Sequence, residues 1–319
     1  MSDVSVKKIQ HGVFGNCAEI DNGRLKLIVT LDFGPRIIYC SIPGMQNMFY
    51  VDEKRAGLGP LLPEYDGDIH RVYGGHRLWA SPEVLPRCYC PDNQSVSFVR
   101  NEYGAVFTAP VEKCTYLQKS IGVTMAEDVA SVTVEHVIKN CGVWEVELAP
   151  WALTMFAAGG REIVPMQNPK TGLLPDRNLT LWDYSNMADK RVYWGREYVT
   201  LAQDKGAAES FKFGLDNRSC WVAVFVNGQV LVKSFDYIED ALYPDGGCNF
   251  ETFTNADFLE CESLGPLTLL PPGETASHGE TWEVYESAAL PDPPDGSKTG
   301  SDCINYEKKL AAIINKYNS

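Results

Sequence analysis

Short apolar runs, in which hydrophobic residues recur at every second position, follow one another along almost the whole chain. RLKLIVT at 24–30 and SVTVEHVIKN at 131–140 are examples, and this period is typical of half-buried strands. Turn-forming stretches such as DNG at 21–23 separate the runs. No sustained 3.6-residue pattern lies between them, which excludes alternating strands and helices. The predicted strands cover 24–30, 33–42, 96–100, 122–126, 131–140, 144–156, 220–227, 229–237, 248–255, 257–265, 267–271 and 281–287.

Only the end of the chain has a different pattern. Residues 290–302, LPDPPDGSKTGSD, have the composition of a linker. In the stretch that follows, apolar residues recur at helical spacing, namely Ile304, Leu310, Ile313, Ile314 and Tyr317. We therefore predict an all-β chain: one antiparallel β-sandwich over 1–289, a linker at 290–302 and a docked C-terminal helix over 303–319.

Composition narrows the function classes. The 28 basic and 42 acidic residues give a formal charge of −14, which disfavours binding to nucleic acid or to an anionic membrane. No run is long and apolar enough for a membrane helix, and the N-terminus lacks the apolar core of a signal peptide. The ten cysteines are therefore expected to be reduced thiols in a cytoplasmic protein. The oligomeric state is not indicated.

Cofactor motifs are missing from the sequence. Cys88 and Cys90 form a close pair, but no second pair or nearby histidine stands at zinc spacing. There is no glycine-rich phosphate loop, dinucleotide fingerprint or nucleophile elbow. We expect neither a metal nor a cofactor.

The stretch RVYGGHRLWASPE at 71–83 gathers polar and aromatic groups around two glycines. It lies in 52–95, the longest segment without a good strand pattern, and long loops are often functional. Arginine can donate to hydroxyl or carboxylate oxygens, tryptophan can lie against a sugar ring, and histidine can transfer protons. The candidate residues are His70, Arg71, His76, Arg77, Trp79 and Glu83. The alternative is a packed loop whose arginines pair with nearby acids.

The late stretch NADFLECESLGP at 255–266 places two carboxylates on one strand face. Alternation puts Glu260 and Glu262 together, and their repulsion can raise one pKa, as a general acid requires. The alternative is a solvated outer face. The remaining histidines fit other roles: His136 shares an apolar strand face and is expected in the core, whereas His11 and His278 fall in a terminal segment and a late turn.

The order of these motifs resembles the galactose mutarotase-like (aldose 1-epimerase) superfamily. The similarity rests on NGRLKLIVTLDFGPRIIYCSI, on the strand ending in Asn-x-Gly within 131–160, and on FLECESLGPLTLLPPGETASHGETWEVY near the end. Together they cover about residues 10 to 287. Within the superfamily, the chain is most similar to a branch with a Gly-Gly-His-Arg-Leu-Trp core. The resemblance implies a supersandwich of two large antiparallel sheets around a carbohydrate cleft.

The resemblance also implies a chemistry. In true mutarotases, a glutamate takes the proton of the anomeric hydroxyl while a histidine protonates the ring oxygen. Glu262 matches the base best, with Glu260 and then Glu251 as further choices. The segment that carries the family's acid histidine corresponds to 150–160, which has none, so His76 or His70 would have to supply the acid.

Three functions follow as expectations. The first is anomer interconversion of a free sugar or sugar acid, with Glu262 as base and His76 as acid. Arg71 and Arg77 would hold substrate oxygens, and Trp79 or Trp151 would stack on the ring. The second is a carbohydrate-binding protein without catalysis, and the third is a lyase or other acid–base enzyme acting on a uronate.

Overall fold

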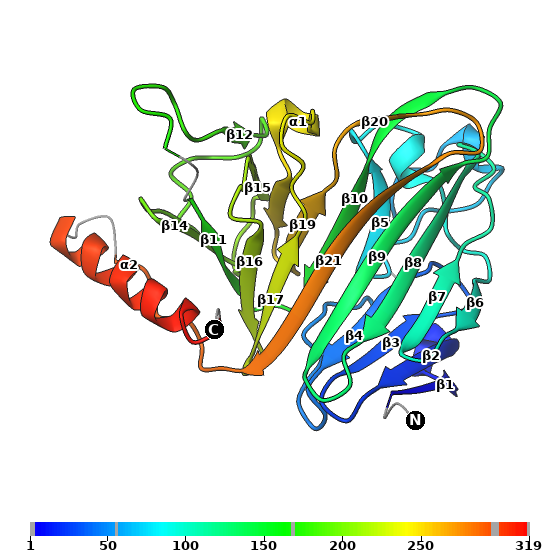
Figure 1. Cartoon of the computed structure of the whole chain (residues 1–319), viewed down its shortest axis with the longest axis horizontal. Coiled ribbons are helices and arrows are strands. Elements are labelled where there is room, and N and C mark those ends of the chain that lie inside the picture. Colours follow the sequence, from blue (N-terminus) through cyan, green and yellow to red (C-terminus); the bar gives the residue numbers. More distant parts are fainter. Residues whose placement is uncertain (1–3, 55–56, 167–169, 295–299, 318–319) are drawn as a thin grey trace.

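The computed structural model describes residues 4–54, 57–166, 170–294 and 300–317. In these residues the chain forms two antiparallel sheets packed face to face, with one long helix at the C-terminal end (Figure 1). The predicted all-β sandwich is confirmed. The helix α2 (Gly300–Ile314) begins three residues before the predicted helix, and part of the predicted linker lies outside the described residues.

The first sheet, here called sheet I, has 11 strands among the described residues. In spatial order they are β1 (Ser5–Gln10), β2 (Asn16–Asp21), β3 (Lys26–Thr30), β4 (Ile37–Ser41), β5 (His76–Ser81), β10 (Val146–Phe156), β19 (Leu259–Leu264), β18 (Phe250–Thr254), β15 (Phe211–Leu215) and β12 (Leu179–Leu181), with β20 (Thr268–Leu270) also paired to β10.

The second sheet, sheet II, has 10 strands in the same described part of the chain. Their order is β13 (Val192–Trp194), β14 (Tyr198–Ala202), β11 (Arg161–Pro165), β16 (Trp221–Val226), β17 (Gln229–Phe235), β21 (Thr275–Glu286), β9 (Ser131–Asn140), β8 (Leu117–Met125), β7 (Gly104–Thr108) and β6 (Ser97–Arg100). Short helical turns lie in the connections: η1 (Gly12–Phe14), η2 (Pro63–Tyr65), η3 (Arg87–Tyr89) and α1 (Pro244–Gly247).

The main hydrophobic core lies between the two sheets, as the alternation of apolar residues requires. A smaller core forms on the outer face of sheet II, where Tyr306, Leu310 and Ile314 of α2 pack on strands β11, β14, β16 and β17. Figure 1 shows α2 against this end of the sandwich. The predicted docking of a terminal amphipathic helix is therefore what the structure shows.

The segment 52–95 differs from the prediction of a long loop. Its residues 76–81 form β5, a strand in the middle of sheet I between β4 and β10. The two preceding glycines have positive φ, and a Cβ at either would come within 2.4 Å of a backbone oxygen, that of Tyr50 for Gly74 and that of Ile37 for Gly75. The Gly-Gly pair thus allows the backbone to pass close to its neighbours where the chain enters the sheet.

Two further expectations are corrected. Cys90 and Cys114 are joined by a disulfide, so the expectation that all cysteines are thiols is wrong at this pair, and Cys90 is not available to a metal. His278 lies in β21 and not in a turn. The eight other cysteines are free thiols.

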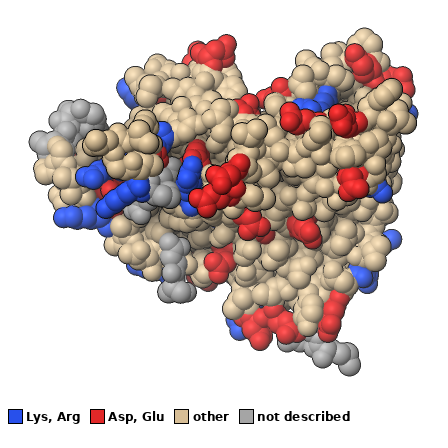
Figure 2. Space-filling model, turned by 45° about the horizontal axis from the view of Figure 1, so that its top comes forward, with Lys and Arg blue, Asp and Glu red and all other residues tan. Residues whose placement is uncertain are grey.

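Charge is spread over the surface. Figure 2 shows acidic side chains scattered across the visible face, and the chain has a formal charge of −14. No helix in the described part of the chain has the length and apolar character needed to cross a bilayer.

Candidate functional site

The outer face of sheet I carries a hollow of about 620 Å³, lined mainly by β5, β10, β19 and β15 and by the segments at 182–184 and 208–210. This volume is within the size range of pockets that bind small molecules. We call it the hollow. Its lining includes Arg77, Trp79, Glu83, Trp151, Trp182, Tyr184, Lys212, Phe253, Phe258, Glu260 and Glu262.

Strand register explains why these residues converge. Arg77 of β5 pairs with Leu153, which pairs with Glu262 of β19, which pairs with Glu251 of β18. One row further along, Trp79 pairs with Trp151. Directly paired residues on neighbouring strands point to the same face, so side chains from distant parts of the sequence share one surface.

The two glutamates of β19 have different surroundings. Glu262 is fully buried; its Oε2 accepts from Trp151 Nε1 at 2.8 Å and from Lys212 Nζ at 3.2 Å. Its Oε1 has no hydrogen-bond partner among the described residues. Glu262 is therefore held through one oxygen, and the other keeps its capacity to accept a hydrogen bond.

Glu260 lies two positions earlier on the same face. Its nearest cation is Arg77, with Nη2 3.6 Å from Oε1. Burial, together with the charge of Glu262, raises the pKa of Glu260 to about 7. The alternative of a solvated outer face is wrong, because the exposed fractions are 8% for Glu260 and 0% for Glu262.

Lys212 of β15 is the central cation of the hollow. Its ammonium lies 2.7 Å from Glu251 and 3.2 Å from Glu262, and it sits over the rings of Trp151 and Trp182. Burial opposes the charge, but the two carboxylates outweigh burial and raise the pKa of Lys212. Burial and the charge of Glu262 raise the pKa of Glu251 to about 8. One ammonium is thus shared by two carboxyl groups.

The structure brings most of the predicted site residues to the hollow. Glu83 lies at its edge and accepts a hydrogen bond from Tyr89. Trp79 lines it, with the Arg77 guanidinium 4.1 Å from its ring centre, so one face of the indole is occupied. His70 also lines it, in edge contact with the rings of Trp79 and Tyr89.

Two predicted residues are not part of this lining. Arg71 pairs with Leu58 through an isolated backbone bridge, and its side chain is not in the wall of the hollow. His76 directly precedes Arg77 on β5. Adjacent residues of a strand point to opposite faces, so the His76 side chain points between the sheets. His76 and Glu262 lie on opposite faces of sheet I, and the expected pairing across one cleft is not formed.

His76 belongs instead to a buried network between the sheets. Its Nδ1 is 2.8 Å from Thr154 Oγ1, and its Nε2 is 2.7 Å from His136 Nε2. His136 Nδ1 lies 2.9 Å from the His278 carbonyl oxygen and must donate to it. Since burial lowers the pKa of both rings, each is neutral, so His76 donates from Nε2 and accepts from Thr154.

Glu280 is the anion of this network. It pairs with Lys233 at 2.9 Å and accepts from Ser263 at 2.5 Å and from Trp282 Nε1 at 2.7 Å. Burial opposes its charge, but the Lys233 ammonium outweighs burial and keeps the pKa of Glu280 below the ordinary range. We call the set His76, His136, Thr154, Lys233, Ser263, His278, Glu280 and Trp282 the inter-sheet network. The predicted core position of His136 is confirmed.

The inter-sheet network also contains a possible metal-binding geometry. Ligand atoms of His76, His136 and Glu280 lie within 4.8 Å of one another. Both facing nitrogens are engaged in the hydrogen bond between the two rings, and the Lys233 ammonium occupies the cation's role beside Glu280. The donor set therefore fits a hydrogen-bonded core better than a metal centre.

Sequence reasoning missed Lys212, Trp182 and Tyr184. Lys212 stands between two phenylalanines in FKFGL at 211–215, a strand pattern that was not recognised and could have been found. Trp182 and Tyr184 reach the hollow from an irregular segment after β12, and their sequence gives no comparable signal.

Comparison with known sequences finds no matching family and no matching curated protein. Solved structures do match. A galactose mutarotase-like protein from Clostridium acetobutylicum aligns with a TM-score of 0.53 and 8% identity, over 89% of this chain and 99% of that one. One from Lactobacillus casei aligns with a TM-score of 0.52 and 10% identity, over 84% and 100%.

A third match is a TPR-domain containing protein from Parabacteroides distasonis. It aligns with a TM-score of 0.58 and 14% identity, over 90% of this chain and 50% of that one. At such identities the comparison establishes the fold alone, which is the galactose mutarotase-like β-sandwich. The chemistry must be argued from the site itself.

Proposed function

We propose that the protein acts on a free sugar or sugar acid in the hollow and interconverts its anomers by acid–base catalysis. The observation that carries the proposal is the pair of carboxyl groups on β19. Glu262 is held by a cation and an indole N–H, whereas burial and its neighbour raise the pKa of Glu260 to about 7. Two carboxyl groups with divergent environments are the usual arrangement of a base and an acid.

The proposed roles follow from these environments. Glu262, through Oε1, which has no hydrogen-bond partner among the described residues, takes the proton of the anomeric hydroxyl. Glu260, in its protonated form, donates to the ring oxygen as the bond from that oxygen to the anomeric carbon breaks. Rotation about the adjacent carbon–carbon bond and closure on the other face then give the second anomer, with both protons returned.

Other residues of the hollow would bind the sugar. Arg77 and Lys212 would hold hydroxyl or carboxylate oxygens, and Glu83 lies at the edge to accept from a hydroxyl. The rings of Trp151, Trp182, Tyr184, Phe253 and Phe258 provide the apolar wall. Since one face of Trp79 is covered by Arg77, its role would be to orient that guanidinium.

His70 is not the acid in this scheme. Burial, with the charges of Arg77 and Arg36, lowers the pKa of His70 to about 3, so the ring is neutral near pH 7 and can only exchange hydrogen bonds. This leaves carboxyl groups as the proton donors of the hollow, which departs from the histidine acid implied by the resemblance.

The direct test is anomer exchange. A freshly dissolved pure anomer is mixed with the protein, and exchange is followed by NMR across a panel of aldoses and uronates. We expect exchange above background, reduced about 10²- to 10⁴-fold in Glu262→Gln. The matched control is Glu286→Gln, an exposed glutamate of β21, which should exchange as the wild type does.

Two other outcomes would contradict the proposed interconversion of anomers. Sugar binding without exchange would identify a carbohydrate-binding protein. New ultraviolet absorbance from an unsaturated product of a uronate would identify a lyase.

We further propose a cytoplasmic location and a small carbohydrate as the partner rather than nucleic acid or membrane. The Cys90–Cys114 disulfide is unusual for a cytoplasmic protein.

A further inference from the structure

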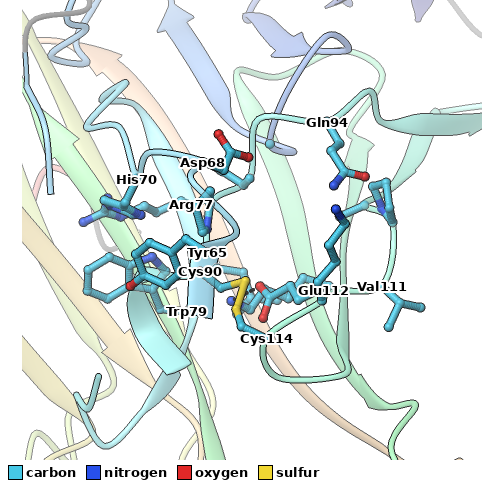
Figure 3. A pocket seen from close by; sticks show the side chains of 18 of the residues that line it. Tyr65, Asp68, His70, Arg77, Trp79, Cys90, Gln94, Val111, Glu112 and Cys114 are labelled. Atoms are coloured by element: carbon cyan, nitrogen blue, oxygen red, sulfur yellow. Dashed lines mark ion pairs between the residues drawn. A yellow bond between two sulfur atoms is a disulfide. The ribbon is translucent and has the colours of Figure 1, made fainter. Parts of the chain in front are cut away.

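A second cavity, here called the side pocket, adjoins the hollow and has a volume of about 120 Å³. Its walls come from the segments at 64–70, 90–94 and 109–114 and from Arg36, Arg77 and Lys119. Figure 3 shows Tyr65, His70 and Arg77 on one side, Gln94 and Glu112 on the other, and the disulfide between Cys90 and Cys114. Arg77 and His70 line both cavities.

The side pocket contains buried polar atoms that no described residue satisfies. They are Nη1 of Arg36, the hydroxyl of Tyr65, Nδ1 of His70, and Nε and Nη1 of Arg77. All four side chains are more than nine-tenths buried. Unpaired buried polar groups are rare in native proteins because each costs about 1–3 kcal/mol, so their concentration in one cavity points to a binding site.

The chemistry of these atoms specifies that ligand. The three guanidinium nitrogens can only donate, and the tyrosine hydroxyl and a neutral imidazole can donate as well. The other buried cation of the pocket, Lys119, is already paired with Glu112 at 2.6 Å. Arg36 donates from Nε to Asp92 at 2.8 Å, and its Nη1 takes no part in that ion pair. The unmatched groups therefore require an acceptor, and two guanidiniums favour an anionic one.

The charge at the rim of the side pocket indicates which of two common oxyanions, phosphate or carboxylate, the pocket favours. Lys113 is an exposed cation of the lining, and it is outnumbered by the exposed carboxylates of Glu64, Asp66 and Asp68. They repel a doubly charged phosphate about twice as strongly as a singly charged carboxylate. The buried donors thus favour an anion, and the rim favours one with a single charge.

We propose that the side pocket binds the carboxylate of a sugar acid whose ring occupies the hollow, with Arg36, Arg77 and Tyr65 as its donors. The inference rests on the proposed sugar site and names its substrate class: uronates rather than neutral aldoses. Arg77 connects the two cavities, since its Nη2 faces Glu260 in the hollow while Nε and Nη1 remain for the carboxylate.

The test compares matched sugars by calorimetric titration. Glucose, galactose and mannose are each paired with the corresponding uronate, so that the members of a pair differ only at the terminal carbon. At least one uronate should bind ten times more tightly than its aldose. Arg36→Lys, which keeps the charge beside Asp92 but lacks Nη1, should reduce this preference about tenfold and leave the affinity for the aldose unchanged.

A milder variant guards against misfolding. Tyr65→Phe removes one hydroxyl and should reduce the preference about threefold. Tyr39→Phe should not change it, because the Tyr39 hydroxyl donates to the Met45 carbonyl and neither residue lines the side pocket. Equal affinities for aldose and uronate would overturn the carboxylate site and leave the sugar site standing. Tighter binding of glucose 6-phosphate than of glucuronate would show that the side pocket binds a phosphate group and not a carboxylate. Binding of none of these sugars would overturn both proposals.

Discussion

The inter-sheet network and the hollow lie on opposite faces of the same strands, and both gather ionisable groups in buried positions. In the inter-sheet network, a chain of hydrogen bonds runs from Lys233 through Thr154 and His76 to His136, and each group donates to the next. Glu280 accepts from three donors. In the hollow and the side pocket, Glu262, Arg77 and Arg36 keep atoms without partners among the described residues. Satisfied polar groups indicate structure, and unsatisfied ones indicate a ligand.

The difference corrects the expected role of His76. A histidine beside an arginine and a tryptophan suggests a binding loop, but on a strand adjacent residues face opposite sides. Arg77 therefore reaches the hollow while His76 enters the core. Its partner across the sandwich is His136 and not Glu262.

The largest effect on stability is expected in the inter-sheet network. Glu280→Gln leaves the Lys233 ammonium buried without its carboxylate, and we expect a loss of about 3–5 kcal/mol in the free energy of unfolding. Denaturant unfolding measures it, with the exposed Glu286→Gln as control. A loss below about 1 kcal/mol would show that the network does not contribute to stability as we describe.

His76→Gln sharpens the contrast between the two faces. The glutamine can replace only part of the hydrogen-bond chain between Thr154 and His136, so we expect a loss of about 1–3 kcal/mol in stability. Anomer exchange per folded molecule, and its pH dependence, should stay at the wild-type level. If the variant folds but the acidic or basic limb of the pH profile disappears, His76 takes part in proton transfer after all.

The smallest effect is expected in the pH dependence of anomer exchange. Because the pKa of Glu260 is raised to about 7, its acid form is present below that pH and is lost above it. Exchange should therefore decrease as pH rises through about 7, approaching tenfold per unit at higher pH. Glu260→Gln should remove this decrease while lowering the maximal rate. A rate that rises with pH over the same range would reverse the assigned roles.

Much of the fold could be predicted from the sequence. Strand alternation at 131–140 gives β9 with its observed bounds, and helical spacing in the tail gives α2 within a few residues. β5 was missed because its two leading glycines and its polar and aromatic residues obscure the alternation. Its central position follows only from the pairing with β4 and β10.

The candidate site was predictable only in part. Alternation correctly places Glu260 and Glu262 on one face, but it does not show that this face is buried. Register between distant strands sets Glu262 in line with Arg77, and Lys212 arrives from a strand that was not recognised. The link between Cys90 and Cys114 is likewise a property of the folded chain.

The central claim is that a sugar binds on the outer face of sheet I against the β19 glutamates. A crystal structure with a bound uronate tests it most directly. The account predicts the anomeric hydroxyl within hydrogen-bond distance of Glu262 Oε1 and the carboxylate within reach of Arg36 and Arg77. A sugar bound elsewhere, with both glutamates untouched, would contradict it.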